Sequence, residues 1–466
     1  MRLPTRHPWR RPVRHRGPAV TAAIAVLALT SCGSGGNTPQ DGITLTIAAN
    51  SIEGGKNAET AQWIKQWVIP EFEKTHPDVT VQFQPSGVDD EQYKTKIALD
   101  LKSRTGADVI DADGIWVGEF AQAGYLKPLT EIGGAAVEQW EGWARIPQAV
   151  QGLGIFDGKK YGLPQGTDGR VLFYNKTLFR KAGLPDNWQP TSWQAIIDAG
   201  TKLKAAGVPT PIQLNAGTAM GEATTMQGVL PLLAGAGAEI YAGGKWTGDS
   251  QAMKDVLGLY RQIYGGSGLG DPKLQQEAKG RDKSFAQFAD GKIGILAESD
   301  YFWRAVVEPR TGVAPMRDRN EAVGYARIPA RQPGAGIRGQ DYVSMSGGAV
   351  RVLNPFSKNP KLAWDLLAFM HSPEATKSQL AGQARISARS DVNDQVLTVD
   401  PMLKYVADEV LPITAYRPGL AVYPQVSTAL QEATAAVVSG KSPAEAAAAY
   451  RGKLEGLVGG AANIAG

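Results

Sequence analysis

The sequence predicts an α/β fold in two lobes, and three observations support this prediction. The 466 residues are too many for a single hydrophobic core. Segments of β-strand composition alternate with segments of helical periodicity, which is typical of a mostly parallel sheet with helices on both faces. Residues 161–176 (YGLPQGTDGRVLFYNK) place a bend, a polar cluster and an apolar strand in succession. Such a stretch is expected where a chain crosses between lobes, and ligand sites often form at such crossings.

The individual elements follow from hydrophobic periodicity and from turn residues. In the first part of the chain we expect strands at 43–48, 79–83 and 107–110, and helices at 58–74, 91–103 and 118–125. After the crossing we expect a helix from Ser192 to about Ala206, a strand at 211–214, a polar loop at 215–227 that enters a helix ending at Ala234, a helix at 250–264 and a strand at 292–297.

The charge balance argues against a nucleic-acid partner. The chain has 49 basic and 45 acidic residues, but residues 1–31 contain six arginines and no acid. The remainder therefore has 43 basic and 45 acidic residues, a net charge of −2. With 43% hydrophobic and 20% charged residues, the composition is that of a globular protein. Without a basic stripe, no nucleic-acid binding is expected.

The N-terminal segment has the pattern of an export signal. An arginine-rich stretch precedes the apolar run Ala19–Leu29, which is too short to span a bilayer. The following Leu29-Thr-Ser-Cys32 resembles the lipobox of bacterial lipoproteins, which implies a signal peptide at 1–31 and lipidation of Cys32. Residues 32–42 then form a flexible tether. Lipidation would anchor the protein on the extracytoplasmic face of the cell membrane. A plain secretory signal with an incidental thiol is the alternative, and Arg10-Arg11 leaves the Sec and twin-arginine routes open.

Residue types for cofactor or nucleophile chemistry are scarce. Beyond the leader, the only histidines are His76 and His371, and Cys32 is the only cysteine. We therefore expect no metal site, no cofactor, no disulfide and no Cys/His nucleophile. Gly334–Gly339 matches G-x-G-x-x-G but lies in a Pro- and Arg-rich loop, so it is interpreted as a chance match. No catalytic residue is assigned, although paired loop carboxylates leave a glycoside hydrolase open as an alternative.

Polar and aromatic residues follow several of the predicted strands, where the ligand crevice of an α/β protein lies. Carboxylates and amides bond to hydroxyl groups, and aromatic faces cover the apolar side of a sugar ring. A polyhydroxylated ligand is therefore expected. The aromatic candidates are Trp116, Tyr301, Trp303, Tyr416 and Tyr423, each of which has a core position as its alternative.

The order of several motifs resembles that of the solute-binding lipoproteins of ABC importers, in the sugar-binding group related to maltose- and multiple-sugar-binding proteins. The motifs are the lipobox, residues 107–129, the 161–176 stretch, residues 285–297 with their Asp-Gly-Lys-Ile-Gly pattern, residues 347–350 with the helix behind them, Arg385–Arg389 and Tyr423–Ser427. Each motif is moderately specific, and their common order over residues 29–460 carries the resemblance.

The resemblance implies a two-lobed periplasmic-binding-protein-like fold with three interlobe crossings and a ligand cleft between the lobes. The crossings are expected near Leu163–Asp168, Val343–Gly347 and Ile386–Ser390. The N-terminal lobe would comprise 43–165 and 347–388, and the C-terminal lobe 166–346 and 389–466. The resemblance also implies a monomer that closes about its hinge on a ligand and docks on the transmembrane subunits of an ABC permease.

The resemblance assigns roles to three places in the sequence. Asp168 corresponds to a ligand-binding carboxylate, Tyr301 lies near a stacking aromatic, and the 222–227 loop lies near a sugar-contacting segment. The chain departs from the family at Glu298–Trp303, where two additional carboxylates indicate further hydroxyl contacts. All candidate ligand-binding residues are Asn50, Ser51, Glu53, Asp113, Trp116, Asp168, Arg170, Asn215, Thr218, Glu222, Gln227, Glu298, Asp300, Tyr301, Trp303, Arg385, Tyr416 and Arg417.

The sequence thus predicts a membrane-tethered binding protein for a carbohydrate, such as an oligosaccharide of the α-glucoside type, and not an enzyme. A second hypothesis is a binding protein for a glycerophosphodiester or a polyamine, for which Arg170, Arg304 and Arg417 could supply a phosphate-binding set. The glycoside hydrolase is the third.

Overall fold

The computed structural model describes residues 42–55, 57–88, 90–383 and 385–465. Ile43–Gly466 form one compact unit. The predicted signal peptide, Cys32 and residues 33–41 of the tether lie outside the described residues. Among the helices that the structure describes, none combines the length and apolar character needed to cross a membrane.

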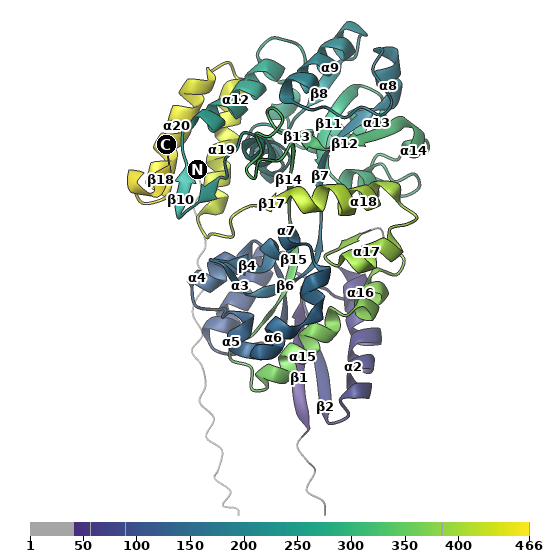
Figure 1. The fold of residues 1–466 in the computed structure, drawn as a ribbon, viewed down its shortest axis with the longest axis vertical. Helices are drawn as coiled ribbons and strands as arrows, with labels where there is room; N and C mark the ends of the chain where they lie inside the picture. The colour runs from purple at the N-terminus through teal and green to yellow at the C-terminus, as the bar shows by residue number, and fades with distance from the viewer. Residues whose placement is uncertain (1–41, 56, 89, 384, 466) are drawn as a thin grey trace, which may run out of the picture. The chain divides into compact units, whose positions relative to one another are not determined.

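A six-stranded sheet forms the N-terminal lobe (Figure 1). Its strands are, in spatial order, β16 (Ile386–Ser387), β6 (Gly162–Thr167), β15 (Gly348–Leu353), β3 (Val109–Asp113), β1 (Ile43–Ala49) and β2 (Val79–Pro85). β1 pairs parallel with β2 and β3, whereas β15 runs antiparallel to β3 and β6, and β16 antiparallel to β6. The prediction of a mostly parallel sheet is therefore wrong for half of this sheet. β6, β15 and β16 adjoin the interlobe crossings, so they need no helical crossover to reach a neighbour.

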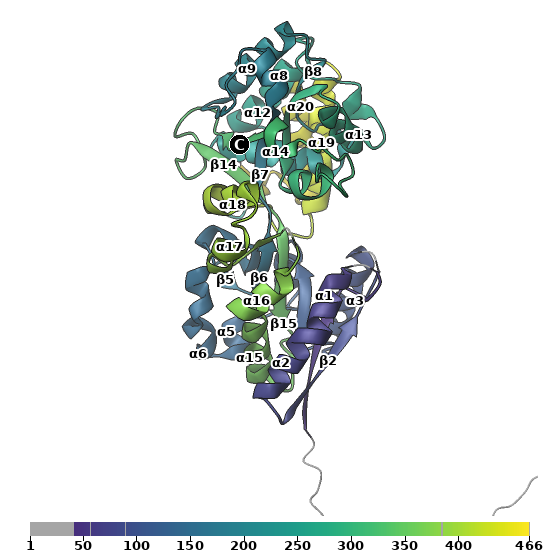
Figure 2. The same cartoon turned by 90° about the vertical axis from the view of Figure 1, so that its right-hand side faces the viewer.

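Helices cover both faces of this sheet, as the alternating pattern predicts (Figure 2). The helix expected at 58–74 consists of α1 (Ala58–Trp63), a π-helical turn η1 (Ile64–Val68) and α2 (Ile69–Thr75). Its apolar side packs with α15 (Pro360–Met370) over Leu45 and Ile47 of β1. On the opposite face, α3 (Asp90–Lys102) and α4 (Trp116–Gln122) pack over Ile110 and Val352.

The C-terminal lobe contains a four-stranded sheet in the order β12 (Val323–Ala326), β7 (Arg170–Asn175), β11 (Ile293–Ser299) and β8 (Thr210–Gln213). Only β11 and β8 are parallel. All residues of β7 are buried, because helices pack on both sides. One core contains α9 (Trp193–Ala205), α12 (Gln251–Tyr264), α19 (Tyr423–Val438) and α20 (Pro443–Leu457). The other contains α13 (Gly280–Ala289), η7 (Phe302–Val306), α18 (Pro401–Tyr405) and η8 (Val406–Val410).

The polar loop predicted at 215–227 is largely helical. It contains η4 (Thr218–Met220), α10 (Glu222–Thr224) and η5 (Thr225–Val229), which lead into α11 (Leu230–Gly235). Its polar residues bond to neighbouring elements, and these contacts stabilise short turns that periodicity does not reveal. The two lobes also contain β4 (Ile155–Phe156), β14 (Tyr342–Ser346), α16 (Pro373–Leu380), α17 (Ser390–Val396) and β17 (Thr414–Tyr416).

Three crossings join the two lobes, which confirms the predicted fold class. The first lies between β6 and β7, the second at Gly347 between β14 and β15, and the third between β16 and α17. The residue boundaries given above for each lobe stay a prediction. The crossings bring polar residues distant in sequence to one place.

Candidate functional site

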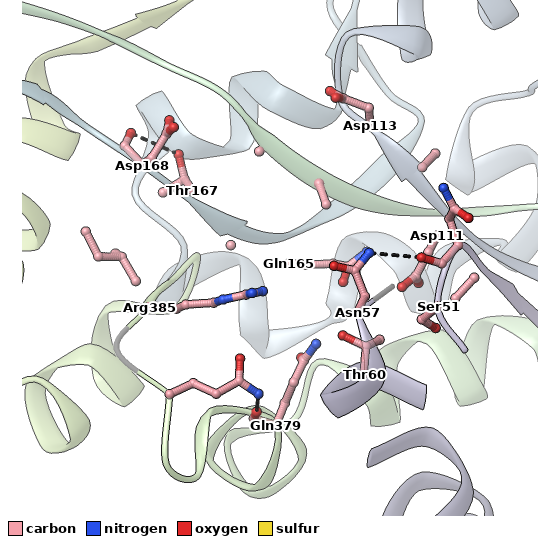
Figure 3. Close-up of a pocket in the computed structure, with 18 of the residues that line it drawn as sticks. Ser51, Asn57, Thr60, Asp111, Asp113, Gln165, Thr167, Asp168, Gln379 and Arg385 are labelled. Atoms are coloured by element: carbon pink, nitrogen blue, oxygen red, sulfur yellow. Dashed lines mark hydrogen bonds between the residues drawn. The ribbon is translucent and has the colours of Figure 1, made fainter. Parts of the chain in front are cut away.

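A cleft of about 460 Å³ opens at the carboxyl ends of β1 and β3, beside the first crossing (Figure 3). This is where a ligand site is expected in an open α/β sheet. Its polar lining comes from the turn after β1, from α1, α3 and β3, from β6, and from the end of α16. These polar residues are Asn50, Ser51, Asn57, Thr60, Asp90, Asp111, Asp113, Gln165, Thr167, Asp168, Arg304, Thr376, Gln379, Gln383 and Arg385. Tyr93 and Trp116 add aromatic surface.

Hydrogen bonds hold the polar side chains of the turn after β1 in place, but some of their polar atoms have no hydrogen-bond partner among the described residues. The Asn50 side-chain amide donates to the Val88 carbonyl at 3.1 Å and to Asp90 at 3.0 Å. Asn57 donates to the Asn50 carbonyl oxygen at 2.9 Å. Asn50 Oδ1 and the Ser51 hydroxyl are buried and have no hydrogen-bond partner among the described residues. A buried polar atom without a partner costs free energy, so these two atoms are suited to bonds with a ligand.

Asp111 is held by a buried arginine behind the cleft. Arg351 Nε lies 2.8 Å from Asp111 Oδ1, and its guanidinium lies 4.9 Å from the centroid of the Trp63 ring. Burial raises the pKa of Asp111, and the Arg351 cation opposes this effect. Burial lowers the pKa of Arg351, because burial disfavours the charged guanidinium. The ion pair between Asp111 and Arg351 therefore compensates both buried charges and supports the cleft wall in the middle of β3.

The end of β3 combines a carboxylate with aromatic rings. Asp113 accepts a hydrogen bond from the Ile115 amide at 3.1 Å. Burial raises the pKa of Asp113, and the nearby Arg417 cation opposes this. Trp116 packs with its ring centroid 6.2 Å from that of Tyr93. Both rings line the cleft and also pack in a hydrophobic core. Trp116 therefore occupies a core position and a position in the cleft wall at the same time.

Asp168 joins the first crossing to the second. Its Oδ1 accepts from the Gly347 amide at 2.7 Å and forms an ion pair with Arg170. Next to it, the Thr167 hydroxyl donates to the Gly347 carbonyl at 2.9 Å. The Asp168 side chain keeps 26% of its surface exposed and lines the cleft. It therefore acts on the hinge and presents a carboxylate oxygen to the cleft.

Asp300 and Arg304 carry this network into the C-terminal lobe. Asp300 accepts from the Gly169 amide at 3.0 Å, and Arg304 Nε lies 2.9 Å from Asp300 Oδ2. Burial and the Asp168 carboxylate together raise the pKa of Asp300 to about 6. Arg304 lines the cleft. The C-terminal lobe thus contributes a guanidinium rather than the carboxylate that the sequence suggested.

Six of the predicted ligand-binding residues line the cleft, namely Asn50, Ser51, Asp113, Trp116, Asp168 and Arg385. Twelve do not, namely Glu53, Arg170, Asn215, Thr218, Glu222, Gln227, Glu298, Asp300, Tyr301, Trp303, Tyr416 and Arg417. Glu53 forms an exposed ion pair with Lys65 at 2.7 Å, and Thr218 is exposed on η4.

Glu298 forms the centre of a buried network instead of facing the cleft. It is fully buried and receives two hydrogen bonds from Arg281, at 2.7 and 2.8 Å. Asn215 and Gln227 donate to it at 3.3 and 3.4 Å. The departure from the family pattern at 298–300 therefore supplies internal ion pairs in this structure, not the expected additional hydroxyl contacts.

A second polar cluster surrounds Glu222. Its carboxylate accepts from Arg417 at 2.9 Å, from the Tyr423 hydroxyl at 2.8 Å and from the Ser427 hydroxyl at 2.5 Å. The partners lie on the segment after β17 and on α19, so this cluster ties together parts of the C-terminal lobe. It supports the fold rather than the 460 Å³ cleft.

The remaining aromatic candidates have structural partners. The Trp303 indole donates to Asp400 at 3.1 Å and lies within a hydrophobic core. The Tyr301 ring lies 5.5 Å from the Arg304 guanidinium. The Tyr416 hydroxyl is 3.2 Å from the Thr167 hydroxyl, and Tyr416 lines two smaller cavities beside the hinge.

Several lining residues were not among the predicted ligand contacts. Gln379 lies in the last turn of α16, and Gln383 follows the helix and donates through its side-chain amide to the Gln379 carbonyl oxygen at 2.9 Å. This amide pair after a well-capped helix start was the available signal. Asn57 precedes α1, Thr60 lies in its first turn, and neither belongs to a distinctive sequence pattern. Among the described residues, no group of three His, Cys, Asp or Glu side chains is arranged to hold a metal ion.

Comparison with known proteins places the chain in a family. The family model described as "Bacterial extracellular solute-binding protein" matches residues 55–377. The chain belongs to this family. The protein is therefore an extracellular solute-binding protein and not an enzyme, as the sequence predicts.

Individual relatives and structures agree with this assignment. A Brucella abortus (strain 2308) protein named as a binding protein is 24% identical over 437 residues, which cover 93% of this chain and 96% of the relative. The sugar-binding protein MalE of Xanthomonas citri has a TM-score of 0.71 at 18% identity, covering 89% of this chain and 97% of that one. The cyclic α-maltosyl-1,6-maltose binding protein of Arthrobacter globiformis has a TM-score of 0.70 at 20% identity, covering 90% and 99%. These likenesses show the fold.

Proposed function

We propose that the protein captures a sugar in this cleft and delivers it to an ABC permease. One observation carries the proposal. The cleft sets the buried, unpartnered polar atoms of Asn50 and Ser51 beside the aromatic surface of Tyr93 and Trp116. Hydroxyl groups can satisfy such atoms, and an aromatic ring can cover the apolar face of a pyranose.

The size of the cleft favours an oligosaccharide. About 460 Å³ lies within the range of sites for drug-sized ligands, about 300–1,000 Å³. An α-glucoside is the first type to test, because the structural neighbour from Arthrobacter globiformis binds a cyclic maltose derivative. Bonds to carboxylates such as Asp168 would contribute on the order of 1.5–3 kcal/mol each.

A polyamine fits the cleft less well. Asp111 and Asp168 already have the cationic partners Arg351 and Arg170. The phosphate-binding set suggested by the sequence is reduced too, because Arg170 and Arg417 are paired with Asp168 and Glu222. Of that set, Arg304 alone lines the cleft.

The expected membrane partners belong to the same proposal. Lipidation of Cys32 would hold the protein at the outer face of the membrane, and the 32–42 tether would let the closed, loaded form reach the permease. A ligand that bonds to both lobes stabilises the closed state, because only that state makes both sets of contacts.

The proposal is tested with a thermal-shift panel on the purified protein, using maltose, longer α-glucosides, other oligosaccharides and monosaccharides. A sugar at about 100 times its Kd stabilises the folded state by roughly 2.7 kcal/mol and raises the melting temperature. Absence of any shift across the whole panel would contradict sugar binding.

Asp168→Asn serves as the site variant. Asparagine keeps an acceptor for the Gly347 amide but removes the charge, so the Kd for the bound sugar should rise about 10- to 100-fold. Asp186→Asn is the matched control, since the Asp186 side chain is 52% exposed and pairs with Arg180. An unchanged Kd in Asp168→Asn would restrict Asp168 to a hinge role.

A further inference from the structure

One arginine in the cleft, Arg385, differs from the arginines around it. Those behind the cleft or beside it are each paired with a carboxylate: Arg170 with Asp168, Arg281 with Glu298, Arg351 with Asp111, Arg389 with Asp391 and Arg417 with Glu222. Arg385 lines the cleft, and among the described residues no carboxylate lies within ion-pair distance of it. Figure 3 shows its side chain extending toward the space between Gln379 and Thr167.

The second arginine, Arg304, reaches the same cleft from the C-terminal lobe. Its Nε is used by Asp300, at 2.9 Å. Its two terminal nitrogens have no hydrogen-bond partner among the described residues. A guanidinium has five donors, so the outer edge of Arg304 remains available to a ligand.

The two cations act on one another. Burial, and after it repulsion from Arg304, lowers the pKa of Arg385, while Glu59 on α1 opposes the effect. Arg385 lies at the third crossing and Arg304 on η7, so the two charges approach the cleft from different elements. Two like charges in a partly dehydrated site are unfavourable unless an anion lies between them.

We infer that the cleft contains an anion subsite formed by Arg304 and Arg385, and that the ligand is a sugar or polyol carrying a carboxylate or a phosphate group. This inference rests on the proposed function and names the class of the sugar. The hydroxyl groups bind to the Asn50 and Ser51 side, and the anionic group binds between the guanidinium groups. Such planar groups recognise carboxylate and phosphate oxygens in pairs.

The test compares matched neutral and anionic ligands on the whole purified protein. The probes are glucose with glucuronate, galactose with galacturonate, and glucose 6-phosphate and glycerol 3-phosphate as phosphate sources. Titration calorimetry in about 50 mM and about 300 mM NaCl gives each Kd at two ionic strengths, because salt screens the attraction between charged groups. We expect an anionic probe to bind about 10-fold or more tightly than its neutral counterpart, and to weaken at the higher salt.

Arg385→Gln should remove this preference, raising the Kd of the anionic probe about 10- to 100-fold while the neutral probe changes little. Arg385→Lys should restore part of it. Arg310→Gln is the matched control, because Arg310 is exposed in the same lobe as Arg304 and does not line the cleft. Arg304→Lys keeps a charge beside Asp300 and provides a second variant that retains the internal ion pair.

The outcomes separate the two proposals. Equal affinity for neutral and anionic probes, or an equal loss of both in Arg385→Gln, would overturn the anion subsite and leave sugar binding intact. If glycerol 3-phosphate binds through Arg385 and no sugar binds, the subsite stands and the sugar proposal fails. If the wild-type protein binds none of these probes, both the anion subsite and the sugar-binding proposal are contradicted.

Discussion

Asp300 and His371 are buried titratable residues that make the stability of the fold depend on pH in opposite directions. Burial and Asp168 raise the pKa of Asp300 from 3.8 to about 6. Its contribution to stability is therefore present below pH 3.8 and is lost as the pH rises through about 6. Burial and the Arg351 cation lower the pKa of His371 well below 6.5. The contribution of His371 is present above pH 6.5 and is lost as the pH falls.

The contribution of Asp300 to the pH dependence of stability can be isolated with the variant Asp300→Asn. Relative to this variant, wild-type protein should lose on the order of 1–3 kcal/mol of unfolding free energy between about pH 4 and 7, because asparagine does not titrate. Urea unfolding at several pH values measures the difference, and His371 cancels since both proteins contain it. The exposed Asp290→Asn should follow wild type. Parallel pH profiles for wild type and Asp300→Asn would contradict the raised pKa.

At the scale of elements, α4 and the segment after β17 meet through two glycines. A Cβ atom on Gly118 would lie 2.4 Å from the Gly419 carbonyl oxygen, and one on Gly419 would lie 2.8 Å from the Ile115 carbonyl oxygen. Backbone cannot move aside as a flexible side chain can, so only glycine permits this approach. The contact joins the N-terminal lobe to Arg417–Leu420 and positions Arg417 near Asp113.

Gly118→Ala should therefore destabilise the protein by about 1–3 kcal/mol, despite the better helix propensity of alanine. Gly452→Ala on α20 is the matched control, because nothing lies within 4 Å of the added Cβ. That variant should stabilise the fold by up to about 1 kcal/mol. Chemical denaturation of both variants measures the effect. A Gly118→Ala variant as stable as Gly452→Ala would show that the two segments separate without cost.

At the scale of the whole molecule, attachment to the membrane and closure around the ligand belong to different parts of the chain. Attachment is predicted from Cys32, which lies outside the described residues. The proposed closure would depend on the crossings, where Asp168, Gly347 and Asp300 link strands of both lobes. The two properties can therefore be changed independently.

Cys32→Ala should release the protein from the membrane without altering its affinity for ligand, because the predicted acyl chains would attach at this cysteine. Fractionation of cells expressing the full-length variant measures release, and the thermal-shift panel measures binding. A variant that still sediments entirely with the membrane fraction would contradict the lipid anchor.

The positions of the crossings were implied by the resemblance to a family, whereas the sequence by itself predicted much of the alternation of strands and helices and the α/β class. These features depend on local periodicity, on turn residues and on caps such as Ser192, whose side chain accepts from Ala195. It also identified Asp113, Trp116 and Asp168 as residues near strand ends, because position at a strand end is a local property.

Only the tertiary structure decided which charged side chains face the cleft. Glu298 and Arg385 both follow the predicted pattern of polar residues beside strands. Glu298 lies within 2.8 Å of Arg281 and is buried, whereas no carboxylate pairs with Arg385 among the described residues. The charge that a ligand meets is what remains after such internal pairing, and pairing depends on distances between segments far apart in the sequence.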